Sequence, residues 1–139
     1  MFQLDKRLQE DTCVIGDMAL SRVFLHRDAN YPWCILVPRR QGLREIYQLD
    51  EAEQVCLLEE SRALAIAMTS LFRPDKLNVA ALGNVVSQLH IHHIVRFTDD
   101  PGWPAPVWGA VAAKAYEPEE LDTRVEMLRS VLKESGLSW

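Results

Sequence analysis

The sequence predicts an α+β fold, in which an antiparallel sheet of about five strands carries one long helix and a closing C-terminal helix. Three observations support this prediction. Short apolar runs separated by polar or proline-containing turns come first, at 13–18, 21–26 and 33–38. A long stretch with helical spacing of apolar residues follows. Two more strand-like runs and a second helical stretch complete the chain, and this block order is typical of α+β proteins.

The N-terminal part begins with a short amphipathic helix within the first dozen residues, where Leu4 and Leu8 share one face. The three apolar runs then predict an antiparallel meander. The basic segment 39–45 follows the meander. It is either a solvated turn or a rim that attracts a substrate phosphate.

Two helices are marked by their ends. Asp50 with Glu53 resembles a capping box and marks the start of the long helix. Pro74 marks its end. Pro118 opens the closing helix, which ends near Gly136. Its apolar stripe, predicted to pack in the core or against a second subunit, consists of Leu121, Val125, Leu128 and Leu132.

Between the helices, residues 76–82 predict a strand that turns at Gly83 and Asn84 into a second strand at 88–97. Residues 99–109 hold three prolines and two tryptophans and predict a stiff, irregular segment. Its aromatic rings are expected to seal a pocket, to meet a second subunit or to cover the edge of the sheet.

Composition limits the class of protein. A chain of 139 residues with 48% hydrophobic content suits one domain, spanning 1–139. The net charge of −5 argues against broad binding to nucleic-acid polymers. Because there is no membrane-length apolar run and no signal peptide, we expect a cytoplasmic protein without a membrane partner. The three cysteines lack metal-site spacing and are interpreted as buried, reduced thiols.

Residues 88–96 hold three of the four histidines and alternate between polar and apolar, as in a half-buried strand. Gln88, His90, His92 and Arg96 would then project from one face. The other face would carry Leu89, Ile91, His93, Val95 and Phe97. Neighbours on one face lie about 6.6 to 7 Å apart, so a phosphate-sized group can contact both His90 and His92. His93 is interpreted as a core or interface histidine paired with a backbone group.

This stretch, QLHIHHIVR, resembles the motif of the histidine triad (HIT) nucleotide hydrolases and transferases, in which three histidines alternate with apolar residues. Gln88, His90 and His92 match the three triad positions. The preceding segment 83–87 resembles the family's Gly-Gln-Ser/Thr-Val segment, and the chain looks most like the bacterial diadenosine-polyphosphate-hydrolase-like branch. Two positions depart from the motif: the first histidine is Gln88, and His93 replaces an apolar residue.

The resemblance implies that His90 attacks the α-phosphate of a purine nucleotide conjugate and forms a nucleotidyl-histidine, which water then hydrolyses. The backbone carbonyl of Gln88 would hold the remote N–H of His90. His92 would contact the phosphate and the leaving group, where general-acid help is worth roughly 10²–10⁴-fold. The conjugate would be a dinucleoside polyphosphate or a nucleoside phosphoramidate.

The resemblance also implies substrate-binding residues. Asn84, with Gly83, matches the position whose amide donates to a phosphate oxygen, although Gly-Asn is also ordinary turn chemistry. Asn78 is a weaker candidate for the same contact. His26 and Asp28 are candidates for the ribose contact.

The resemblance further implies a homodimer and no cofactor, apart from a divalent cation that can accompany the substrate phosphates. Two alternatives stay open. The Gln88 change is also compatible with a nucleotide-binding or sensing module that has lost efficient turnover. A histidine-based metal site, built by His90 and His92 with a partner such as His26 or Asp99, is less well supported, since no further ligand cluster has the required spacing.

Overall fold

The computed structural model describes all residues, 1–139, and confirms the α+β prediction. Five strands form one antiparallel sheet in the order β1-β2-β3-β5-β4. The elements are α1 (Lys6–Asp11), β1 (Thr12–Asp17), β2 (Ser21–His26), β3 (Trp33–Pro38), α2 (Glu51–Phe72), β4 (Lys76–Ala80), β5 (Ile91–Arg96) and α3 (Pro118–Leu132), with short 3-10 helices η1 (Ile46–Gln48) and η2 (Lys133–Ser135).

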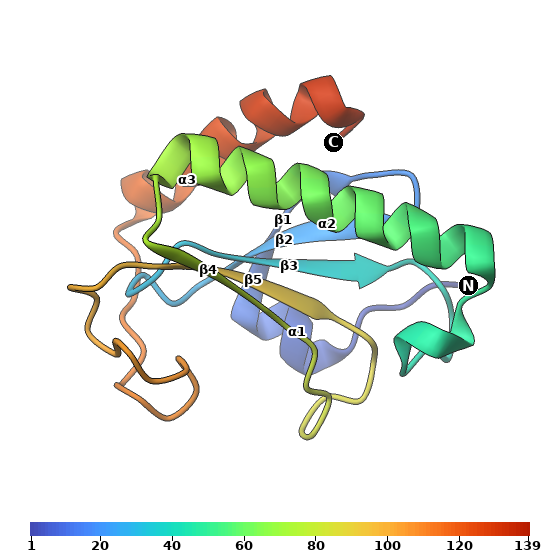
Figure 1. Ribbon diagram of the computed structural model, residues 1–139, viewed down its shortest axis with the longest axis horizontal. Helices are drawn as coiled ribbons and strands as arrows, with labels where there is room; N and C mark the ends of the chain where they lie inside the picture. Colours follow the sequence, from blue (N-terminus) through green and yellow to red (C-terminus); the bar gives the residue numbers. More distant parts are fainter.

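The two long helices cover one face of the sheet, with α2 and α3 side by side above it (Figure 1). Twenty buried apolar residues fill the space between these helices and the strands. The predicted stripe of α3 contributes Val125, Leu128 and Leu132 to this core, with Leu121 packed at its margin. The sequence had left core and subunit packing open for this stripe, and it packs in the core.

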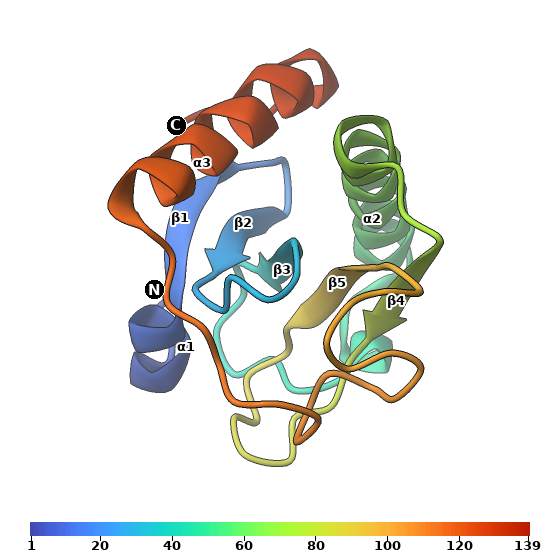
Figure 2. The same cartoon turned by 90° about the vertical axis from the view of Figure 1, so that its left-hand side faces the viewer.

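The opposite face of the sheet is also covered, by α1 and by the irregular segments 81–90 and 97–117 (Figure 2). A second cluster of nine buried residues lies here and includes Leu8 of α1, Trp33 and Ile35 of β3, and Ile94 of β5. All six residues of β5 are therefore buried. The prediction of a half-buried strand was wrong in this respect, although the assignment of side chains to the two faces holds.

Helix α2 begins and ends as its sequence indicates. The Asp50 carboxylate accepts the backbone N–H of Glu53 at 2.8 Å and caps the first turn. At the other end Arg73 adopts φ 49°, ψ 61°, which turns the chain out of the helix just before Pro74. The helix thus spans 22 residues.

The connection between β4 and β5 differs from the predicted tight turn. Both strands are shorter than expected, and residues 81–90 form an irregular segment between them. The backbone N–H of Leu89 donates to the carbonyl of Leu43 at 2.9 Å. The chain just before β5 therefore bonds to the segment after β3, and it is not available for pairing with β4. Gly83, with φ +80°, lies within this connection.

No helix of the structure has the length and apolar character needed to cross a bilayer. All three cysteines are free: Cys34 is buried, and Cys13 and Cys56 are half-buried. Burial raises the pKa of the Cys34 thiol well above its usual range, so this residue behaves as an apolar core side chain.

Candidate active site

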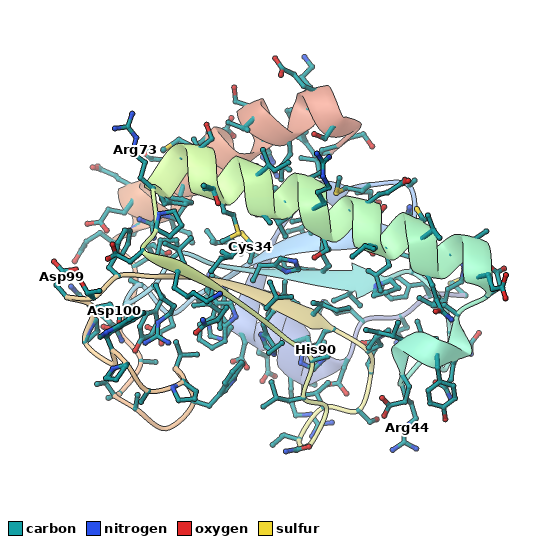
Figure 3. All side chains as sticks on the ribbon, viewed as in Figure 1. Cys34, Arg44, Arg73, His90, Asp99 and Asp100 are labelled. Atoms are coloured by element: carbon teal, nitrogen blue, oxygen red, sulfur yellow. The ribbon has the colours of Figure 1, made fainter.

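A cavity of about 330 Å³ lies on the sheet face that α1 and the irregular segments cover. His90 and His92 both line it, together with His26 and Trp33 from the neighbouring strands. Figure 3 shows His90 in the 81–90 segment just before β5, far from Asp100, which follows the other end of the strand. A larger open groove of about 690 Å³ contains no histidine and lies on the other side of Gln88.

His90 is held in one tautomer by the backbone. Its Nδ1 lies 2.7 Å from the carbonyl oxygen of Gln88. Because a carbonyl oxygen can only accept, Nδ1 must carry the proton. The neutral ring then has its lone pair on Nε2, which is the nitrogen needed for attack on an electrophile.

His92 is held in the opposite tautomer by a side chain. The indole Nε1–H of Trp33 donates to Nδ1 of His92 at 2.9 Å. Since an indole nitrogen can only donate, Nδ1 of His92 is unprotonated and its Nε2 carries the proton. The ring centroids of His90 and His92 are 4.9 Å apart. A lone-pair nitrogen and an N–H donor therefore lie side by side.

The surroundings keep His92 neutral. Burial lowers its pKa to about 3, with further lowering from His90, His26 and His93. Burial also lowers the pKa of His26, although Asp11 and Asp28 oppose the shift. The imidazoles of His26 and His92 are thus uncharged at neutral pH.

The comparisons with known proteins agree with this geometry. The model of the HIT domain family matches residues 7–99. The chain belongs to the HIT family. HIT proteins are generally nucleotide hydrolases or transferases, so membership supports a function of this general type. No curated protein matches the chain.

Three solved histidine triad proteins are similar over nearly their whole length. The protein from Marinobacter aquaeolei shares 49% identity, with 96% of this chain and 98% of that chain covered and a TM-score of 0.93. The protein from Bradyrhizobium japonicum shares 46% identity over 93% and 96% of the two chains, with a TM-score of 0.91. The protein from Sinorhizobium meliloti shares 38% over 95% and 98%, with a TM-score of 0.92.

At the first triad position, the backbone and the side chain of Gln88 have separate partners. The carbonyl holds His90, as the HIT resemblance implied. The side-chain amide turns away to the N-terminal segment: its Oε1 accepts the N–H of Asp5 at 2.8 Å, and its Nε2 donates to the carbonyl of Gln3 at 2.9 Å. The side chain of Gln88 thus fixes the chain just before α1.

The structure brings some predicted HIT site residues together and leaves others outside. Gly83, Asn84 and His26 line the cavity. Asn78 does not: its Oδ1 accepts from the guanidinium of Arg96 at 3.0 Å. Asp28 does not either, because its carboxylate accepts the backbone N–H groups of Asn30 and Lys114.

His93 points to the helix side of the sheet, as predicted. It is fully buried, and its Nδ1 donates to the carbonyl of Ile91 at 3.2 Å. Its Nε2 therefore accepts from the hydroxyl of Ser61 on α2, at 2.7 Å. The interpretation of His93 as a core histidine paired with a backbone group is confirmed.

Of the roles expected for the aromatic rings of segment 99–109, Trp108 has the one of closing a pocket. Its ring lies 5.8 Å from that of Trp33 and 4.9 Å from that of His92, and it lines the cavity. Trp103 instead packs on Arg96, whose guanidinium carbon lies 5.7 Å from the centroid of the Trp103 ring. One tryptophan of this segment thus walls the cavity, and the other covers a buried charge.

Sequence reasoning missed three cavity residues: Arg7, Asp11 and Trp33. Arg7 and Asp11 belong to α1, which the sequence predicted only as a short amphipathic helix. Trp33 lies in the predicted strand 33–38 and had no assigned role. Strand alternation places Trp33 and Ile35 on the same face, but the register that pairs Ile35 with His92 is visible only in the structure.

Proposed function

We propose that this protein hydrolyses or transfers the nucleotidyl group of purine nucleotide conjugates by attack at the α-phosphate, as a member of the diadenosine-polyphosphate-hydrolase-like branch would. The observation that carries the proposal is the pair of opposite tautomers. His90 presents a lone pair on Nε2 and His92 presents an N–H, and both line one cavity.

In the proposed reaction Nε2 of His90 forms a bond to the α-phosphorus while the bond from phosphorus to the leaving group breaks. The carbonyl of Gln88 stabilises the proton on Nδ1 as positive charge develops on the ring. His92 donates a hydrogen bond to a phosphate oxygen or to the leaving atom. Water then attacks phosphorus, breaks the P–N bond and releases the nucleoside monophosphate.

The substrate would lie with its nucleoside toward the early strands. His26 and Trp33 provide flat ring surfaces there, and Asn84, which also lines the cavity, can donate an amide N–H to a phosphate oxygen. We propose no resident metal. No group of three or more His, Cys, Asp or Glu side chains is placed to hold one, so any divalent cation would arrive on the substrate phosphates.

We further propose that two copies pair through the free edge of the sheet. Strand β4 is an edge strand whose Val79 is exposed, and α2 beside it exposes Val55 and Leu58. These side chains line an apolar hollow of about 460 Å³, and unpaired edges commonly pair with another strand. Sedimentation should show a dimer that Leu58→Asp converts to a monomer; a wild-type monomer would rule the pairing out.

The test of activity is a single-turnover incubation with diadenosine tetraphosphate and with a fluorogenic adenosine phosphoramidate. AMP release and covalent mass are followed for wild type, His90→Ala and a control, His93→Gln, which changes a histidine outside the cavity. We expect a nucleotidyl adduct in wild type and the control but none in His90→Ala. If wild type binds AMP but forms no adduct and releases no product, the protein is a binding module and the hydrolase proposal fails.

A further inference from the structure

We infer that Trp33 restricts this site to substrates whose leaving group departs as a stable oxyanion, such as a nucleotide polyphosphate, and disfavours phosphoramidates. The inference rests on the proposed function and names the substrate class within it. Its basis is the hydrogen bond from the Trp33 indole to His92, which leaves His92 able to donate a hydrogen bond but unable to give up a proton.

The bond from Trp33 limits the charge that His92 can carry. An imidazolium needs an N–H at both nitrogens, and here Nδ1 already faces an indole N–H at 2.9 Å. Protonation would bring two N–H groups against each other and would leave the buried indole without an acceptor, which is costly. Trp33 thus selects the uncharged ring.

Neighbouring rings keep Trp33 in place. Its ring stacks on His26 with centroids 3.9 Å apart and planes 8° from parallel. The rings of Tyr31 and Trp108 meet it edge-on, at 6.5 and 5.8 Å. Contacts on several sides hold the indole in one rotamer, so the bond to His92 is part of a fixed aromatic cluster.

The titratable groups around His92 also disfavour its charged form. The titratable groups that act on it are His90 on the same chain segment, His26 from β2 and His93 from β5, and all three oppose a positive charge. Asp11 and Arg7 also line the cavity, at the α1 wall. The effect of Asp11 falls on His26. The pKa of His92 is accordingly lowered to about 3, chiefly by burial.

Leaving groups differ in whether they need a proton from His92. When His90 attacks an anhydride, the electron pair of the breaking P–O bond stays on a phosphate oxygen, which is stable as an anion. A hydrogen bond from Nε2–H of His92 is sufficient to stabilise this departing oxyanion, and no proton is transferred from His92 to it. When it attacks a phosphoramidate, the electron pair stays on nitrogen, and the amine must gain a proton to leave. Neutral His92 could supply this proton only by becoming an imidazolate anion, which is far too basic to form here.

The experiment compares two substrates that share the adenosine 5′-phosphoryl group and differ in the leaving group. Single-turnover rates of adduct formation are measured for diadenosine tetraphosphate and for an alkylamine phosphoramidate. Since general-acid help is worth roughly 10²–10⁴-fold, we expect wild type to favour the anhydride by about a hundredfold or more. Trp33→His, whose ring nitrogen can accept as well as donate, should narrow this preference.

The control is Trp139→Phe, which changes an exposed tryptophan that packs on Arg129 outside the site. It should keep the wild-type preference. Nitrogen NMR of His92 provides a readout that does not depend on turnover. Nδ1 should be unprotonated from pH 5 to 8 in wild type, and in Trp33→Phe, which lacks the indole N–H, Nδ1 should carry the proton in a fraction of the molecules.

Equal rates on the two substrates in wild type, or a protonated Nδ1 at neutral pH, would overturn the inference and leave the hydrolase proposal standing. Absence of an adduct with both substrates would overturn the hydrolase proposal, and the inference with it. The two failures are therefore distinguishable.

Discussion

The side chain of Gln88 is bonded to the backbone of Asp5, with Oε1 accepting the Asp5 N–H at 2.8 Å. Nε2 of the same amide donates to the carbonyl of Gln3, so one side chain bridges two backbone groups of the N-terminal segment. The replacement of a triad histidine by glutamine thus has a visible consequence. The amide fixes the N-terminal segment beside the site, while the carbonyl of the same residue serves His90.

The fixed segment places Arg7 at the cavity wall. Its Nε and Nη2 donate to the carboxylate of Asp5 at 3.2 and 3.1 Å, and its Nη1 donates to the carbonyl of Val85 at 2.9 Å. The guanidinium of Arg7 lowers the pKa of the Asp5 carboxyl, and His90 adds a small effect of the same sign. Arg7 has five N–H groups, so two remain for a substrate phosphate.

We therefore expect Arg7→Ala to weaken AMP binding by about ten- to a hundredfold while adenosine binding stays unchanged, because adenosine lacks the phosphate. Gln88→Ala should weaken AMP binding in the same direction by releasing the segment that carries Arg7. The double variant should bind AMP no more weakly than Arg7→Ala, since both changes act through one guanidinium. Calorimetric titration of the four proteins measures all three expectations.

Lys6→Ala is the matched control, because Lys6 is an exposed cation of the same helix that does not line the cavity. It should bind AMP as wild type does. Additive losses in the double variant would show that Gln88 acts on AMP by another route. Equal losses for AMP and adenosine would show that the variants perturb the fold rather than a phosphate contact.

Strands and helices could be predicted from the sequence because their signals are local. Strands β2 and β3 have the predicted bounds, and the Asp50 cap and Pro74 delimited α2. The 81–90 segment could not be predicted, because its conformation depends on the bond from Leu89 to Leu43, a partner distant in sequence. The burial of both faces of β5 depends in the same way on distant segments that fold over it.

For the site, alternation along one strand was enough to place His90 and His92 on the same face. The sequence failed for side chains whose roles depend on hydrogen bonds to residues distant in the chain. The carboxylate of Asp28 is used by two backbone N–H groups, and the amide of Asn78 by Arg96. Trp33 acquires its role only from the neighbouring strand that carries His92. A single sequence does not contain such pairings.

The stability of the fold should fall as the pH is lowered through the range of free histidine. Burial lowers the pKa of His92 to about 3 and that of His93 to about 4, from 6.5 in the free side chain. Below pH 6.5 the unfolded chain therefore binds protons that the folded chain does not. Each group removes up to about 1.4 kcal/mol of stability per pH unit until its folded pKa is reached. Urea unfolding at fixed protein concentration, from pH 7 to 4.5, measures this slope.

His93→Gln should make the slope shallower by about 1 kcal/mol per pH unit, because its amide does not titrate. Ser61→Ala is the companion variant: it removes the hydrogen bond to His93 but leaves the imidazole in place. It should lower stability and keep a steep slope. The aspartates with lowered pKa, which are Asp5, Asp17 and Asp100, act below about pH 4 and leave this window unaffected. An unchanged slope in His93→Gln would mean that His93 is not held neutral in the folded state.

The acidic residue that contacts a ribose should be Asp11 rather than Asp28. The exposed carboxylate of Asp11 lines the cavity together with His26, and Asp28 does not line it. A carboxylate can accept hydrogen bonds from both ribose hydroxyls. In Asp11→Ala, adenosine binding should therefore weaken by about tenfold, and the preference for adenosine over 2′,3′-dideoxyadenosine should disappear.

Asp28→Ala should give the opposite pattern. Its carboxylate bonds the backbone N–H groups of Asn30 and Lys114, so its loss should lower the free energy of unfolding by about 1–3 kcal/mol. The preference for the ribose hydroxyls should remain, because the side chain lies outside the cavity. Titrations of both nucleosides, at a temperature where each variant is folded, separate the two residues. If only Asp28→Ala loses the preference, the ribose contact is made by Asp28, between β2 and β3, and not by Asp11 of α1.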